Sequence, residues 1–79
     1  MKKYSKNQMK RDIMKEGRVL GLHTGSTAAI ADRVVEEIDE WVMKRGDITE
    51  ADLNRVASNK LKKYNPDLAY MYKMKGKVI

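Results

Sequence analysis

The stretch STAAIADRVVEEIDEWVMKR, residues 26–45, decides the fold of this chain. Its apolar residues recur at intervals of three and four, which is the spacing of one face of an α-helix. They are Ala28, Ala31, Val34, Val35, Ile38, Trp41 and Val42. Acidic residues occupy much of the remaining face. We therefore predict a long amphipathic helix over residues 26–45 that forms the backbone of the core.

Start and stop signals on either side of this stretch predict further helices over residues 5–16, 50–64 and 66–75. Ser5 is expected to cap the first of them, with Gln8 completing a capping box, and Gly17 to end it. Thr49 and Asn65 are the expected caps of the last two. The predicted fold class is all-α, a small four-helix domain spanning residues 1–79.

The segment between the first two helices, RVLGLHTGS at residues 18–26, is predicted to be a loop. Val19, Leu20 and Leu22 are expected to anchor this loop on the core. Ser26 is expected to cap the long helix that follows.

Charge is distributed in three blocks along the 79 residues, whose formal net charge is +6. Residues 1–20 carry +5, residues 21–59 carry −4 and residues 60–79 carry +5. The two basic ends have three possible partners: the acidic middle of the same chain, the acidic middle of another copy, or an outside polyanion. The sequence leaves all three alternatives open.

Little in the sequence points to catalysis. The chain has no cysteine and a single histidine, His23, which we expect in an exposed loop. One histidine with scattered carboxylates does not supply a metal site or a nucleophile with its base. No apolar run approaches the length of a membrane span, and the start lacks the apolar region of a signal peptide. We therefore expect a non-enzymatic, cytoplasmic protein with no cofactor or metal.

The basic C-terminal segment gives one alternative function, a small accessory protein that binds RNA or single-stranded nucleic acid. In it, lysines alternate with aromatic residues, as in proteins that stack bases and track a phosphate backbone. The candidate residues are Lys60, Lys62, Lys63, Tyr70, Lys73 and Lys75. We expect the core to take Tyr64 and Tyr72, which leaves Tyr70 free.

Four stretches resemble the helical part of the ATP-cone domain, a small nucleotide-sensing module of ribonucleotide reductases and of a bacterial repressor of their genes. They are YSKNQM (4–9), IADRVVEEIDEWV (30–42), DITEADLNRVASNKL (47–61) and DLAYMY (67–72). The resemblance implies a regulatory module with ATP or dATP as its ligand. It also implies that ligand binding shifts a balance between monomer and oligomer.

Two departures from the ATP-cone pattern affect the implied nucleotide site. The basic hairpin that covers the nucleotide in that family is expected to be missing, because only three residues precede Tyr4. Gln8 stands where the family usually has a lysine. The candidate phosphate-binding residues that remain are Lys2, Lys3, Lys6 and Lys10.

A third alternative is a dimeric protein-interaction module with no small ligand. The chain has six methionines and no phenylalanine. Met14, Met43 and Met74 lie off the clearest core stripes, and a methionine-rich groove is a surface to which a partner helix can adapt.

Overall fold

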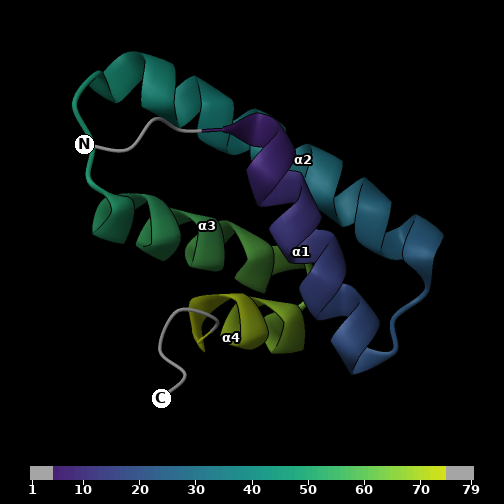
Figure 1. Ribbon diagram of the computed structural model, residues 1–79. Helices are drawn as coiled ribbons and strands as arrows, with labels where there is room; N and C mark the ends of the chain where they lie inside the picture. Colours follow the sequence, from purple (N-terminus) through teal and green to yellow (C-terminus); the bar gives the residue numbers. More distant parts are fainter. Residues whose placement is uncertain (1–4, 75–79) are drawn as a thin grey trace.

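The computed structural model describes residues 5–74, and these form four α-helices (Figure 1). In chain order they are α1, Lys6–Leu20; α2, Thr24–Arg45; α3, Glu50–Tyr64; and α4, Pro66–Met74. No β-strand occurs between residues 5 and 74, so the predicted all-α, four-helix class is confirmed. Lys75, the predicted end of the last helix, lies outside the described residues.

Each helix packs against two others: α1 lies on α2 and α4, and α3 lies on the same two helices. Figure 1 shows α1 crossing in front of α2, with α3 and α4 on the opposite side of the molecule from the long helix. The buried apolar cluster between them is made by Met9, Ile13, Ala31, Val34, Val35, Ile38, Ala57, Leu61, Leu68, Ala69 and Tyr72. The predicted stripe of α2 thus supplies more of this core than any other helix does.

Three predicted helix caps are confirmed, since each side chain accepts a hydrogen bond from the backbone N–H three residues on. The pairs are Ser5 Oγ with Gln8 N (3.2 Å), Thr49 Oγ1 with Asp52 N (3.1 Å) and Asn65 Oδ1 with Leu68 N (3.1 Å). The side chain of Gln8 does not complete the expected capping box. Its amide nitrogen donates forward to Asp12 Oδ1 at 3.0 Å.

Helix α1 is longer than predicted, because Gly17 lies inside it and the helix ends at Leu20. Gly17 is buried where α1 crosses α2, at a point where a side chain would collide with Thr27. Gly21, with φ 77°, is the left-handed residue that ends the helix. The N–H of Gly21 bonds to Arg18 O (3.0 Å) and that of Leu22 to Gly17 O (2.9 Å), which is a Schellman motif. The predicted end of the helix at Gly17 was therefore wrong. Gly17 allows α1 to pack closely on α2, and Gly21 ends α1.

Helix α2 begins at Thr24, two residues before the predicted start, and its cap is His23 instead of Ser26. The imidazole Nδ1 of His23 accepts from the N–H of Gly25 (3.1 Å) and of Ser26 (3.4 Å). His23 is exposed, as predicted, but it lies at a helix end and not in a long loop.

Two expected core contacts are also corrected. Val19 is 65% exposed, because the extra turn of α1 carries it to the outer face of the helix; Leu20 and Leu22 do pack on the core. Tyr64 is 38% exposed and not buried, since its hydroxyl reaches a carboxylate on α2. Tyr70 is 63% exposed, as predicted.

Candidate functional site

The candidate nucleotide-binding lysines that the structure describes lie at the start of α1, where both form ion pairs with α2. Lys6 Nζ is 3.8 Å from Asp39 Oδ2, and Lys10 Nζ is 2.7 Å from Asp32 Oδ1. Lys2 and Lys3 lie outside the described residues. At Lys6 and Lys10, then, the basic N-terminal block pairs with the acidic middle of the chain, which is the intramolecular alternative left open by the sequence.

The candidate nucleic-acid-binding residues divide into one paired lysine and an exposed set. Lys60 Nζ lies 3.5 Å from Glu37 Oε1 on α2. The side chains of Lys62, Lys63, Tyr70 and Lys73 are exposed, and the three lysines among them form no ion pair with another described residue. Lys75 lies outside the described residues.

Glu37 is the centre of a polar cluster, made of Glu37, Lys60 and Tyr64, that ties α2 to α3. The hydroxyl of Tyr64 donates to Glu37 Oε2 at 2.7 Å, while Lys60 faces the other carboxylate oxygen. The pKa of Glu37 is lowered, chiefly by the Tyr64 hydrogen bond; partial burial opposes this, and the positive charge of Lys60 adds to it. The same hydrogen bond raises the pKa of Tyr64. This arrangement stabilises the charged form of Glu37. The three described residues of the cluster therefore hold α2 and α3 together and show no arrangement for catalysis.

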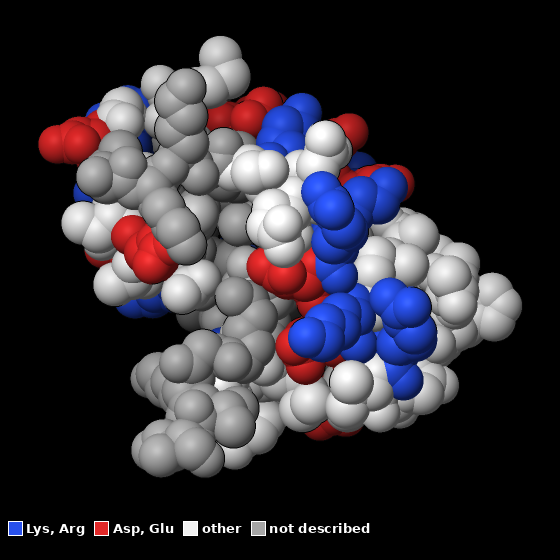
Figure 2. Space-filling model, viewed as in Figure 1, with Lys and Arg blue, Asp and Glu red and all other residues white. Residues whose placement is uncertain are grey.

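A row of basic residues that we did not single out from the sequence lies along the outer face of α1. Arg11, Lys15 and Arg18 are all exposed, and none forms an ion pair with another described residue. We call these three residues the α1 basic stripe. Figure 2 shows Lys and Arg side chains gathered along this helix, with acidic side chains beside them. Spacings of four and three residues place the stripe on one helix face.

The four- and three-residue spacing of the stripe is present in the sequence. It indicates a shared helix face only if the first helix continues past its predicted end at residue 16. Ending that helix at residue 16 left Arg18 in a loop, so that only two of the three basic residues shared a helix. Because α1 continues to Leu20, Arg18 instead lies on the same face one turn further on.

Residues 5–74 show neither a metal-binding cluster nor a membrane-spanning helix. No group of three or more potential ligands among residues 5–74 is arranged to hold a metal ion. Nδ1 of His23 is used by the cap of α2. Within the same residues, none of the helices is long and apolar enough to cross a membrane.

The chain matches no protein-family model, no curated protein and no solved structure. The resemblance to the ATP-cone domain therefore stays a prediction from the sequence.

Proposed function

We propose that this protein is a non-enzymatic binding module for single-stranded nucleic acid, and that the α1 basic stripe is its contact surface. The observation that carries the proposal is that Arg11, Lys15 and Arg18 are exposed on one face without a described ion-pair partner. Three acids of α2 instead pair with lysines of α1 and α3: Asp32 with Lys10, Glu37 with Lys60 and Asp39 with Lys6. A phosphate backbone can therefore contact the stripe without breaking ion pairs that join α1, α2 and α3.

The spacing of the stripe suits a phosphate backbone. The seven residue-to-residue steps from Arg11 to Arg18 correspond to about 10 Å of rise along the helix. With one phosphate at each cation, a single strand makes three contacts over that length. Three cations thus face about three anions, and the expected affinity is modest and dependent on salt.

A second contact surface is supported by the exposed side chains of α3 and α4. Lys62, Lys63 and Lys73 supply positive charge, and Tyr70 offers an exposed ring on which a base can stack. These four residues belong to the C-terminal surface that the sequence predicted; of its other two members, Lys60 pairs with Glu37 and Lys75 lies outside the described residues.

The ATP-cone resemblance supports a second candidate function, regulation by ATP or dATP. Lys6 and Lys10 lie one turn apart on the side of α1 that faces α2, so a triphosphate could contact both. It would have to displace Asp39 and Asp32 to do so. Titration with ATP and dATP tests this candidate: saturable amide shifts at residues 6 and 10 support it, and their absence removes it.

Fluorescence anisotropy of a labelled oligonucleotide of about 20 nucleotides, measured from low to high salt, tests the nucleic-acid proposal. Three phosphate contacts predict that log K falls with log salt with a slope of about −2. The double variant Arg11→Gln, Lys15→Gln should bind more weakly and with a shallower slope. A matched variant, Arg33→Gln, Lys44→Gln, removes the same two charges from exposed positions of α2. Equal weakening in both variants, or no binding at low salt, would contradict the proposal.

A further inference from the structure

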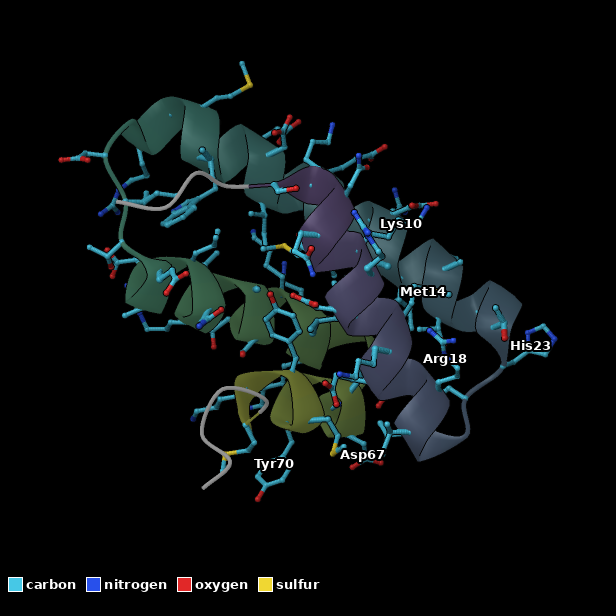
Figure 3. The ribbon with its side chains drawn as sticks, in the orientation of Figure 1. Lys10, Met14, Arg18, His23, Asp67 and Tyr70 are labelled. Carbon is cyan, nitrogen blue, oxygen red and sulfur yellow. The ribbon has the colours of Figure 1, made fainter. Side chains whose placement is uncertain are left out.

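A cavity of about 190 Å³ lies where the end of α1 meets the start of α2, and it opens to solvent beside the stripe. It is lined by Met14, Arg18, Leu22, Thr24 and Thr27. Figure 3 shows Met14 and Arg18 following each other along α1 toward the turn that leads to His23. The cavity is therefore bounded by two helices and by the turn that joins them.

Two backbone features form this cavity. Gly17 lets α1 approach Thr27 closely, and this fixes the crossing of the two helices. The Schellman motif after α1 then folds the chain back so that Leu22 lines the cavity.

The lining combines an apolar part with hydrogen-bond donors. Met14 and Leu22 are half-buried and provide apolar surface. The guanidinium of Arg18 has no described ion-pair partner, and Thr24 adds a hydroxyl. The hydroxyl of Thr27 already donates to His23 O at 3.0 Å. None of the described lining residues is acidic. The strongest hydrogen-bond donor left without a partner in the lining is therefore the positively charged guanidinium of Arg18.

These features define the ligand by size and by charge. A volume of 190 Å³ is smaller than the pockets of about 300 Å³ or more that hold drug-sized molecules. An arginine binds a carboxylate through two parallel hydrogen bonds. We propose that this cavity binds a small organic carboxylate, with the apolar body against Met14 and Leu22 and the carboxylate on Arg18.

Carboxylate binding in the cavity does not require nucleic-acid binding, although Arg18 belongs to both surfaces. A strand that follows the stripe needs Arg11 and Lys15, neither of which lines the cavity. A carboxylate ligand in the cavity needs contacts with Met14 and Leu22. A phosphate backbone on the stripe does not need them. The double variant Arg11→Gln, Lys15→Gln should therefore lose oligonucleotide affinity and keep carboxylate binding, so the two proposals can fail separately.

The test is an NMR titration of the full 79-residue chain with benzoate, following backbone amides and the methyl groups of Met14 and Leu22. Benzamide, a neutral molecule of the same shape, and inorganic phosphate, an anion without an apolar body, are titrated in parallel. We expect saturable shifts at residues 14, 18, 22 and 24 with benzoate. Binding of benzamide should be at least about tenfold weaker, because the charge-assisted hydrogen bonds are lost.

Two variants with the same loss of charge on the same helix complete the test. Arg18→Gln should weaken benzoate binding at least about tenfold. Arg11→Gln should leave it unchanged, since Arg11 does not line the cavity. The inference is overturned by absence of saturable shifts at the four residues, by equal binding of benzamide or phosphate, or by equal weakening in the two variants. Both replaced side chains are exposed, so the amide spectrum of each variant should keep the dispersion of the parent.

Discussion

Gly17 of α1 lies directly against Thr27 of α2: a Cβ built on Gly17 would be 2.5 Å from Thr27 Cγ2 and 2.9 Å from its Oγ1. Thr27 is 1% exposed, so it has little room to move away. The helices therefore cross at a distance that only a glycine permits. This crossing also fixes the last turn of α1, which carries Arg18.

Replacing Gly17 with alanine should destabilise the fold. The added methyl group overpacks the crossing, at a cost of about 1–3 kcal/mol. Alanine is favoured over glycine inside a helix by up to about 1 kcal/mol, which offsets part of this cost. Urea unfolding should show a net loss of stability for Gly17→Ala in the parent chain.

The same substitution in a Thr27→Ala background is the matched control. There Cγ2 and Oγ1 are gone and only the Cβ of residue 27, at 3.2 Å, stays close, so Gly17→Ala should be much less destabilising than in the parent chain. We expect a coupling free energy of about 1 kcal/mol or more between the two positions. Equal effects in the two backgrounds would show that the two residues are not packed as described.

The Tyr64 hydroxyl should control the ionisation of Glu37. In Tyr64→Phe the pKa of Glu37 should rise toward its ordinary value, because the main cause of its lowering is removed. A lowered pKa in the folded state adds stability that is present above the unfolded-state pKa and is lost as pH falls through the folded-state pKa. The variant should therefore lose less stability than the parent chain on acidification.

Carboxyl ¹³C NMR titration of Glu37 measures this shift, and urea unfolding at neutral and acidic pH measures its effect on stability. Tyr70→Phe is the control, because this substitution removes the same type of hydroxyl from an exposed tyrosine elsewhere in the chain. An unchanged titration of Glu37 in Tyr64→Phe would mean that the hydrogen bond does not set its pKa.

His23 should stabilise the start of α2 as its cap. His23→Ala leaves the N–H groups of Gly25 and Ser26 without their side-chain acceptor, which should lower the free energy of unfolding by about 1 kcal/mol. His23→Asn should retain most of that stability, because asparagine is among the preferred capping residues. Thermal or urea unfolding would refute this role if the alanine variant were as stable as the parent.

Ser58 should be replaceable by alanine with a gain in stability. Its side chain is buried in α3, and its Oγ has no hydrogen-bond partner among the described residues. Removing an unsatisfied buried hydroxyl should add about 1 kcal/mol. Asn59→Ala, at an exposed position of the same helix, separates this gain from the effect of helix propensity alone. A loss of stability in Ser58→Ala would point to a bond that the hydroxyl does make.

The sequence predicted the features that depend on near neighbours. Ser5, Thr49 and Asn65 each cap a helix through the N–H three residues away, so the residue type and the periodic pattern after it suffice. The apolar stripe of residues 26–45 likewise follows from its own period. Such local agreement explains why the fold class was correct.

The features that the sequence did not predict depend on contacts between helices. Gly17 resembles a helix stop until Thr27, ten residues later, is known to pack on it. Tyr64 occupies a core position by period, yet its hydroxyl bonds to Glu37, 27 residues away. The candidate site differs from the one predicted from the sequence for the same reason. The pairing of Lys10 with Asp32 and the continuation of α1 through Arg18 are both known only once the helices are packed together.

The most direct test of the proposed function is an amide NMR titration of the labelled protein with a short single-stranded oligonucleotide at low salt. We expect saturable shifts centred on residues 11, 15 and 18 of α1, which disappear as salt is raised. Shifts confined to residues 62–73 would transfer binding to the second surface and contradict the assignment to α1. No shifts at low salt would contradict nucleic-acid binding itself.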